Sequence, residues 1–410
     1  MINTVHIQHS AKSAGSAALR LNRAFLEAGL NSYIVSFQSS FNDTDRVIYA
    51  GRTSKYIASL NDRITSFLSR RNNKEYGLYT YSLLGSDVSK IEEIRKSDVI
   101  YLHWVQGGFL SLSSIRKILE LNKPVVFFMH DMWSITGGCH YSFNCDKYKT
   151  RCCNCQVFSN QRDNDLSTKQ FDKKQKLYSQ FDNIYFIAPS LWMTECAKDS
   201  SLARQKPVFN IPNIINEDIF KPVDKTFARK MFNISDKGLV IAFGAMSLNS
   251  PYKGWAYMKE ALKVLKYNFN SNDITMLVFG SGFNSAIASD IPYNTRFLGY
   301  LNDEYSLALV YNAADVFVTP SLADNLPTTI LESLSCSTPV VGFNVGGIPD
   351  MIRHKENGYI AEYKDAKDLA NGIRFCIETK ISGWLPDSFL KNNILEKHMD
   401  LFKTAGINLG

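Results

Sequence analysis

The sequence predicts an α/β protein that contains two doubly wound parallel sheets. Short runs rich in Val, Ile and Phe recur along the chain, and each run is followed by a stretch with helical spacing. Strands that are apolar throughout and alternate with helices are typical of parallel sheets covered on both faces. Because 410 residues exceed what one ordinary hydrophobic core holds, we expect two domains.

The strand series falls into two groups that separate near residue 206. The first group contains TVHIQ, SYIVSF, DVIYLHW, PVVFFMH and IYFIAPS, and the second contains VFNIPN, LVIAFGA, ITMLVFG, TRFLGY, VFVTPS and PVVGF. Proline and asparagine residues interrupt the pattern around this point. We therefore expect one domain over residues 1–205, a second over residues 206–380, and a C-terminal helix within residues 381–410 that packs back on the first domain.

The composition is that of a globular protein, but the charge is unevenly distributed. Hydrophobic residues make up 45% of the chain and charged residues 21%, which excludes the disordered and fibrous classes. Residues 1–206 hold 27 Lys and Arg against 18 Asp and Glu, a net charge of +9, whereas the rest of the chain carries −2. A basic half suits a nucleic acid, an anionic lipid or a phosphorylated substrate, and charge alone does not choose among them.

No sequence feature directs the chain across a membrane. The longest apolar runs are short pieces such as VVFFM, far below the roughly 18 residues of a membrane span. The N-terminus lacks the basic start and apolar core of a signal peptide, so we expect a cytoplasmic protein. Its eight cysteines are then expected to be reduced thiols or metal ligands.

One segment, SLADNLPTTILESLSCSTPVVGF, carries two carboxylates at a junction between a strand and a helix. Open parallel sheets bind ligands at such carboxyl ends, and a helix N-terminus attracts phosphate. Within the helix, Glu332 could accept two hydrogen bonds from a vicinal diol such as ribose. On these residues alone, an equally good alternative is that Asp324 only caps the helix and Glu332 is solvated.

Several segments together resemble glycosyltransferase family 4, the retaining nucleotide-sugar enzymes of GT-B fold. The resemblance lies in the segment above, in the following NVGGIPDMI, in Lys253-Gly254, in the glycines Gly280 and Gly282 of LVFGSG, and in FLGYLND. It covers nearly the whole second half in the expected order. The resemblance implies two Rossmann-like domains that face a central cleft.

The resemblance also implies roles for individual residues. Glu332 would hold the donor ribose, Asp324 would contact the donor hexose, and Lys253 would neutralise the leaving diphosphate. A positive charge at that place stabilises the negative charge that develops as the sugar departs. The remaining donor contacts would come from the backbone of Asn325, Leu326 and Gly280.

Two departures from the family pattern concern these roles. The family usually has Glu where this chain has Asp324, which is one methylene shorter. It also commonly carries an Arg a few positions before the Lys, where this chain reads Ser247-Leu248-Asn249. Phosphate neutralisation would then rest on Lys253 or on a basic residue of the other domain.

In the first half, polar residues follow three of the predicted strands. Gly15 and Ser16 lie between the first strand and its helix, where a donor group could approach backbone N–H groups, or where the chain simply turns. His130, which the resemblance places near the donor sugar and acceptor, follows PVVFFM, and His103-Trp104 could contact the acceptor. A single histidine is more often structural than catalytic.

A cysteine-rich insertion over residues 139–155 offers a metal site. Cys139, Cys145, Cys152 and Cys155 could hold a structural zinc ion, with His140 or Cys153 as substitutes. The alternative is a set of buried thiols without a metal. Four protein ligands would leave zinc no open position, so any zinc here would be structural. The resemblance implies that no cofactor is required for catalysis.

Two further features have competing interpretations. In SKYIASLNDRITSFLSRR, one helical face carries Ile57, Leu60, Ile64, Phe67 and Leu68, which would pack on the domain or lie on a membrane surface. Asp43-Thr44-Asp45 matches the Asp-x-Asp of metal-dependent transferases, but about one such match is expected by chance.

The sequence thus predicts a retaining glycosyltransferase that moves a hexose from a nucleotide diphosphate sugar. The resemblance implies a saccharide or lipid-linked saccharide acceptor in bacterial surface polysaccharide synthesis, as in capsule or O-antigen. We expect no nucleic-acid partner, and a cytoplasmic location that can include peripheral contact with the inner face of the membrane. The alternative is a non-catalytic protein of the same fold that binds sugar nucleotides or glycans.

Overall fold

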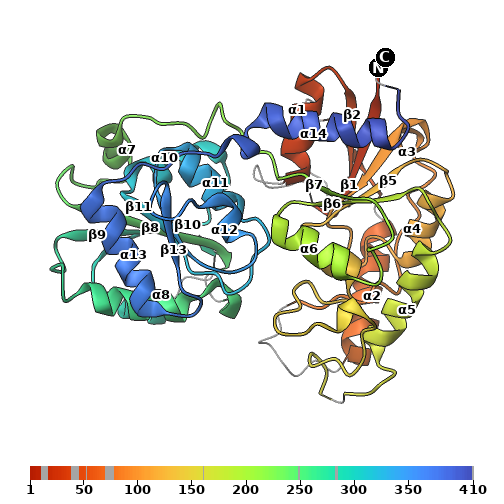
Figure 1. Ribbon diagram of the computed structural model, residues 1–410, viewed down its shortest axis with the longest axis horizontal. Coiled ribbons are helices and arrows are strands. Elements are labelled where there is room, and N and C mark those ends of the chain that lie inside the picture. Colours follow the sequence, from red (N-terminus) through yellow and green to blue (C-terminus); the bar gives the residue numbers. More distant parts are fainter. Residues whose placement is uncertain are drawn as a thin grey trace. The chain divides into compact units, whose positions relative to one another are not determined.

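The computed structural model describes residues 1–10, 17–37, 46–51, 53–69, 78–159, 161–247, 250–281 and 285–408. The chain divides into two compact units, one formed by residues 1–214 with 392–410 and one formed by residues 215–391 (Figure 1). Within the described ranges, no helix combines the length and the apolarity that a membrane span requires.

The first unit contains a parallel sheet of seven strands in the order β3-β2-β1-β4-β5-β6-β7. Its strands are β1 (Asn3–Gln8), β2 (Asn31–Ser36), β3 (Val47–Tyr49), β4 (Val99–Leu102), β5 (Val125–Phe128), β6 (Ile184–Ala188) and β7 (Val208–Asn210). Its helices are α1 (Ala17–Glu27), α2 (Thr53–Ser69), α3 (Glu92–Lys96), α4 (Leu112–Leu119), α5 (Leu166–Tyr178), α6 (Leu191–Asp199) and α14 (Lys391–Thr404), with short 3₁₀ turns at Trp133–Ile135 and Lys147–Lys149.

The second unit contains a parallel sheet of six strands in the order β10-β9-β8-β11-β12-β13. Its strands are β8 (Leu239–Ser247), β9 (Ile274–Ser281), β10 (Asn294–Gly299), β11 (Val316–Thr319), β12 (Val340–Phe343) and β13 (Gly358–Ala361). Its helices are α7 (Lys225–Met231), α8 (Trp255–Leu265), α9 (Ser285–Asp290), α10 (Glu304–Ala313), α11 (Thr328–Ser335), α12 (Ile348–Met351) and α13 (Ala366–Thr379), with 3₁₀ turns at Pro251–Lys253 and Asp387–Phe389.

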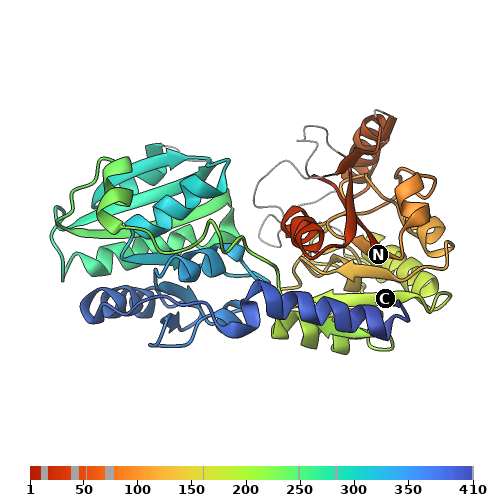
Figure 2. The same ribbon diagram turned by 90° about the horizontal axis from the view of Figure 1, so that it is seen from above.

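Each sheet is buried on both faces, as the continuous apolar strands predict. Successive side chains of a strand point to opposite faces. In β4, Ile100 and Leu102 therefore pack in one core with α4 and α5, while Val99 and Tyr101 pack in another with α1 and α14. Figure 2 shows α14 running along the first unit, to which the apolar residues Ile394, Leu401 and Phe402 attach it.

The order of the strands places a switch point in each sheet. In the first unit the chain moves outward from β1 to β2 and β3, then returns to pair β4 with the other side of β1. The second unit does the same at β8 and β11. Ligands of open α/β sheets bind outside the carboxyl ends of the strands at such points.

The division between the units differs from the predicted one. It falls after Ile214 rather than after residue 205, because VFNIPN contributes β7 to the first sheet instead of opening the second. Residues 381–391 belong to the second unit, so the segment that packs on the first unit begins at residue 392.

Helix α2 packs on the unit through small and polar residues, and of its predicted apolar face Ile57 and Ile64 are only half-buried. Its buried residues are small or polar, namely Ser54, Ala58, Asn61 and Thr65. Three large side chains face outward, since Tyr56 is 79%, Leu60 51% and Phe67 77% exposed. Close packing explains the small buried side: a Cβ on Gly108 would lie 2.5 Å from the Cα of Ala58.

Candidate functional site

The switch point of the second unit is where the structure gathers the predicted donor-site residues. Lys253 follows β8, and Asp324 follows β11, so both lie beyond the carboxyl ends of the two central strands. Helix α11 begins directly after the Asp324 loop. No side chain caps its start, where Pro327 occupies the N-cap position. The alternative in which Asp324 serves as the cap is therefore wrong.

Asp324 instead forms an ion pair with Lys253. The ammonium Nζ donates to Asp324 Oδ2 at 2.6 Å, and the side chains are only 23% and 11% exposed. Burial alone would lower the pKa of Lys253, but the adjacent Asp324 carboxylate outweighs it and raises that pKa. Lys253 is therefore a fixed cation at neutral pH.

Two glycines allow the segments that carry this pair to meet. Gly254 has a φ of +74°, and a Cβ there would lie 1.7 Å from the carbonyl oxygen of Pro320. Gly346 has a φ of +57°, and its Cβ would lie 1.9 Å from the carbonyl oxygen of Asp324. No side chain fits at either position, which gives a physical reason for the Lys-Gly and Gly-Gly motifs.

Glu332 is a buried carboxylate rather than a solvated helix residue. It is 2% exposed, and one oxygen accepts a hydrogen bond from the Tyr311 hydroxyl of α10 at 3.0 Å. Asn325 and Leu326 are buried in the loop before α11. Gly280, near the end of β9, has a φ of +122°.

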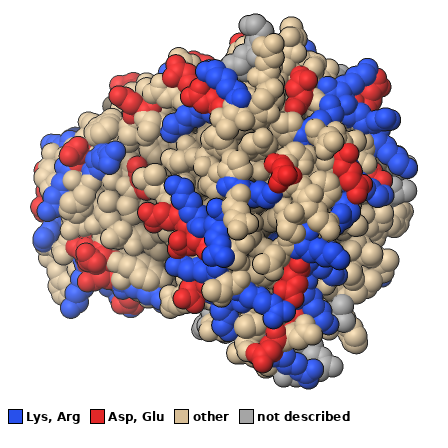
Figure 3. All heavy atoms as spheres, turned by 45° about the vertical axis from the view of Figure 1, so that its right-hand side comes forward, with Lys and Arg blue, Asp and Glu red and all other residues tan. Residues whose placement is uncertain are grey.

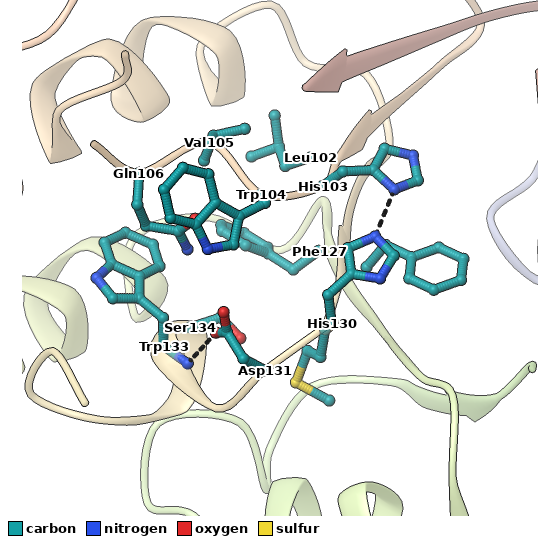
Figure 4. A pocket seen from close by; sticks show the side chains of 12 residues that line it. Leu102, His103, Trp104, Val105, Gln106, Phe127, His130, Asp131, Trp133 and Ser134 are labelled. Carbon is teal, nitrogen blue, oxygen red and sulfur yellow. Dashed lines mark hydrogen bonds between the residues drawn. The ribbon is translucent and has the colours of Figure 1, made fainter. Parts of the chain in front are cut away.

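In the first unit, the two predicted histidines lie next to each other at the ends of β4 and β5. His103 Nδ1 lies 2.9 Å from His130 Nε2, and the rings are stacked with their centroids 5.1 Å apart (Figure 4). Both line a small cavity of about 10 Å³, together with Trp104, Gln106 and Asp131. The cavity is about large enough for one water molecule.

Asp131 is an acid with a side chain only 12% exposed, and sequence reasoning did not single it out. One oxygen accepts from the backbone N–H of Trp133 at 2.8 Å, and the other lies 2.5 Å from His140 Nδ1. Burial would raise the pKa of Asp131, but His140 and the hydrogen bonds together hold it below its usual value. Its position directly after β5, beside His130, is the signal that could have found it.

The cysteine-rich segment is folded against α5. Lys174, which is fully buried, donates to the Trp133 and Thr136 carbonyl oxygens and lies 3.6 Å from the centroid of the Trp133 ring. Burial lowers the pKa of Lys174 to about 7. Gly137 N–H donates to the Cys152 sulfur at 3.2 Å.

The structure brings the predicted zinc ligands near one another without closing a metal site. Cys139 and Cys155 share a hydrogen bond, and together with burial and the nearby Cys152 and Cys145 this bond raises the pKa of the Cys139 thiol well above its usual value. Within the part of the chain that the structure describes, no three or more His, Cys, Asp or Glu side chains are grouped as a metal site. The four cysteines proposed as ligands all lie in described ranges as free thiols. A zinc ion there would require their side chains to rearrange, and it stays a proposal.

Two other predicted features lie outside the described residues. These are Gly15-Ser16, which the sequence places between β1 and α1, and Asp43-Thr44-Asp45 of the chance Asp-x-Asp match.

The fold is that of the GT-B glycosyltransferases. Anabaena Alr3699/HepE in complex with UDP and glucose aligns with a TM-score of 0.65 at 16% identity, covering 98% of this chain and 100% of that one. A glycosyltransferase from Rickettsia africae aligns with a TM-score of 0.68 at 14% identity, covering 99% of both chains.

Sequence comparison adds a match to a family for part of the chain. Residues 237–379 match the family described as "Glycosyl transferases group 1". A UDP-Gal:alpha-D-GlcNAc-diphosphoundecaprenol alpha-1,3-galactosyltransferase of Escherichia coli is 25% identical over 181 residues, 42% of this chain and 45% of that protein. An uncharacterized glycosyltransferase of Haemophilus influenzae is 28% identical over 133 residues, 31% of this chain and 36% of that protein. The chain thus matches less than half the length of these relatives.

Proposed function

We propose that the protein is a retaining glycosyltransferase that moves a hexose from a nucleotide diphosphate sugar to a saccharide or lipid-linked saccharide acceptor. The observation that carries the proposal is the Lys253–Asp324 ion pair, held at the uncapped start of α11 and at the switch point of the second sheet.

The charges at the start of α11 suit a diphosphate. The start of a helix carries about half a positive charge, and Lys253 adds a full one. When a diphosphate enters, Lys253 can exchange its Asp324 partner for a phosphate oxygen, which leaves Asp324 able to accept hydrogen bonds from sugar hydroxyls. The same pair would then neutralise the leaving group and orient the hexose. Glu332 would bind the ribose in place of, or together with, the Tyr311 hydroxyl.

In a retaining transfer, the bonds change as follows. The bond between the anomeric carbon and the diphosphate oxygen breaks, and a bond from that carbon to the acceptor oxygen forms on the same face. The acceptor proton goes to the departing diphosphate oxygen, so the step needs no protein base. Lys253 stabilises the charge that appears on the leaving group. We expect transfer to persist in EDTA.

The acceptor is proposed from the relatives. The Escherichia coli relative is named for transfer to a GlcNAc-diphosphoundecaprenol, a lipid-linked saccharide. Another protein of the same fold is a lipopolysaccharide outer core galactosyltransferase, with a TM-score of 0.55. Both support a role in bacterial surface polysaccharide synthesis, such as capsule or O-antigen.

A lipid-linked acceptor would require contact with a membrane, and we propose that α2 provides it. Its exposed apolar residues, Tyr56, Leu60 and Phe67, are accompanied on the same helix by exposed Lys55 and Arg63. Beside α2, three basic residues line a pocket that has no acidic lining residue, namely Arg116, Lys173 and Lys176. Figure 3 shows one face of the molecule on which many Lys and Arg side chains are interspersed with Asp and Glu. Apolar side chains with flanking cations suit an anionic lipid surface.

A donor screen tests the enzymatic proposal. UDP-, GDP- and ADP-sugars would be incubated with the full chain, and nucleoside diphosphate release measured with and without saccharide acceptors. Release from at least one donor is expected. Calorimetric binding of a nucleoside diphosphate without release from any donor would favour the non-catalytic alternative.

Vesicle flotation tests the membrane proposal. The protein should float with phosphatidylcholine vesicles that contain phosphatidylglycerol, and added salt should weaken the binding. Serine at positions 56, 60 and 67 together should abolish it. Tyr267→Ser is the matched control, because Tyr267 is 89% exposed in the second unit. Equal binding of the triple variant would refute the role of α2.

A further inference from the structure

Two side chains that line the cavity beyond β4 and β5 have buried polar atoms without a hydrogen-bond partner. They are Gln106, in the segment after β4, and Ser134, in the 3₁₀ turn after β5, and they are only 4% and 6% exposed. Neither Gln106 Oε1 nor Ser134 Oγ has a partner among the described residues. Buried polar atoms of this kind are uncommon in folded proteins. Two of them in one cavity indicate that a polar group enters it.

The other polar residues of the cavity limit what that group can be. His103 uses both ring nitrogens, since Nε2 lies 3.0 Å from His6 Nδ1 and Nδ1 lies 2.9 Å from His130 Nε2. Each oxygen of Asp131 accepts one described hydrogen bond and has room for a second. The cavity therefore offers acceptors and a negative charge. It suits a group that carries an O–H or N–H and repels a phosphate or a carboxylate.

The size of the cavity admits one polar atom and not a whole sugar ring. Its volume of about 10 Å³ is that of a single water-sized group. Figure 4 shows Trp104 and Gln106, from the segment after β4, facing Ser134 and Asp131, from the segment after β5. A sugar hydroxyl can donate to Gln106 or Asp131 and accept from Ser134. The half-buried Trp104 offers an apolar surface for the ring that carries this hydroxyl.

We propose that this cavity binds one hydroxyl group of the saccharide acceptor, with the sugar ring against Trp104. The inference rests on the proposed function, in which the second unit holds the donor through Lys253 and Glu332. A sugar bound in the first unit is then the acceptor. Gln106 and Ser134 become specificity-determining residues, because their unpaired atoms distinguish a sugar that has this hydroxyl from one that lacks it.

The neighbourhood of the cavity fits an acceptor that is attached to a lipid. The segment that carries Trp104 and Gln106 packs directly on α2, where a Cβ on Gly108 would lie 2.5 Å from the Cα of Ala58. Helix α2 is the element that we propose to lie on the membrane. A saccharide joined to a membrane lipid would therefore reach the first unit next to the segment that lines the cavity.

Saturation-transfer NMR of the full chain tests the subsite without a donor. The probes are the methyl glycosides of glucose, galactose and N-acetylglucosamine, and the wild type should bind at least one. Gln106→Leu and Ser134→Ala should each weaken its binding at least about fivefold, because each removes a hydrogen bond to the hydroxyl. Gln175→Leu is the matched control, since Gln175 is exposed on α5 and does not line the cavity, and it should stay within about twofold.

These measurements have outcomes that overturn the proposal. A wild type that binds none of the three glycosides would do so, as would cavity variants whose affinity stays within about twofold of the wild type. Thermal unfolding shows whether each variant folds. Ser134→Ala is the smaller change, and it carries the test if Gln106→Leu does not fold.

Monodeoxy forms of the bound glycoside separate a sugar hydroxyl from a trapped water. One monodeoxy form should bind the wild type at least about fivefold more weakly than the parent, and Gln106→Leu should not weaken it further. If Gln106→Leu weakens the parent and every monodeoxy form equally, the cavity holds only a water and the proposal is wrong.

The donor screen fails or succeeds independently of this result. Glycoside binding that depends on Gln106, without nucleoside diphosphate release from any donor, would support the subsite and favour the non-catalytic alternative. Release from a donor, with no glycoside bound by the wild type, would overturn the subsite and leave the proposed function intact.

Discussion

Lys253 and Asp324, 71 positions apart in the sequence, form a 2.6 Å ion pair at the switch point of the second sheet. When no ligand is bound, the pair holds the Lys253 ammonium in place. Each side chain also neutralises the other, although on the proposed function Lys253 contacts a diphosphate and Asp324 a sugar. Donor binding must therefore exchange this contact for new ones, and substitutions that release one partner should separate diphosphate affinity from turnover.

Asp324→Asn should tighten binding of a nucleoside diphosphate while reducing sugar transfer. The substitution frees Lys253 from its partner, so the phosphate no longer competes with a carboxylate. We expect about a three- to tenfold lower Kd, or about 0.7 to 1.4 kcal/mol, by calorimetry. Asp324→Glu is the control, because it keeps the charge and should leave the Kd within about twofold. Weaker diphosphate binding by Asp324→Asn would contradict the claim that Asp324 and the phosphate compete for Lys253.

Glu332→Ala should reduce use of the donor about 30- to 1000-fold, measured as kcat/KM. It removes one or two charged hydrogen bonds to the ribose, about 2 to 4 kcal/mol. Tyr311→Phe should have a smaller effect, because it removes only the hydroxyl that contacts Glu332 at 3.0 Å. An effect of Glu332→Ala below threefold would reject its assignment to the ribose.

Gly254→Ala should cost more stability than Gly299→Ala. Both glycines have a positive φ, +74° and +67°, so both substitutions strain the backbone. Only at Gly254 would the added Cβ also lie 1.7 Å from a carbonyl oxygen, that of Pro320; at Gly299 nothing lies within 4 Å. We expect about 1 kcal/mol for Gly299→Ala and about 2 to 4 kcal/mol for Gly254→Ala in denaturant unfolding. Equal losses of unfolding free energy would show that the segment around Pro320 moves enough to accommodate the Cβ at position 254.

The first unit should lose stability in mild acid. Burial lowers the pKa of His6 and His398 to about 3 and that of His130 to about 4, from an ordinary value of 6.5. The unfolded chain therefore binds more protons between these values. The stabilisation is fully present above about pH 6.5 and is lost as the pH falls toward 4, at about 1.4 kcal/mol per pH unit for each histidine.

A substitution isolates one of these contributions. His398→Phe should reduce the pH slope of the unfolding free energy by about 1.4 kcal/mol per unit between pH 6 and 4. His354→Gln, which removes an exposed histidine of the second unit, is the comparison variant, and His398→Phe should reduce the slope by more than it does. An unchanged slope in His398→Phe would mean that this histidine is not buried in its neutral form.

The sequence predicted those elements whose burial determines their residue types. Both sheets could be predicted because strands buried on two faces are apolar throughout, and the strand–loop–helix corner at Asp324 followed from residue types alone. The three-residue strand β7 was assigned to the wrong unit, because so short a strand shows no periodicity and its partner is chosen by tertiary packing.

Other features depended on contacts that no local pattern contains. An apolar stripe identifies the two sides of α2, but it does not say which side faces the unit; the close approach of Gly108 to Ala58 decides that. The ion pair of Lys253 follows from the order of the strands. His6 lies in the run TVHIQ, and only the pairing of β1 with β4 brings it to His103.

The most direct test of the central claim is donor turnover by Lys253→Ala. If Lys253 neutralises the leaving diphosphate, kcat for the donor that the screen identifies should fall about 100- to 1000-fold. Lys263→Ala on α8 is the control, because Lys263 is 58% exposed and pairs only with Glu260 among the ion pairs described. Turnover by Lys253→Ala equal to that of the wild type would contradict the account.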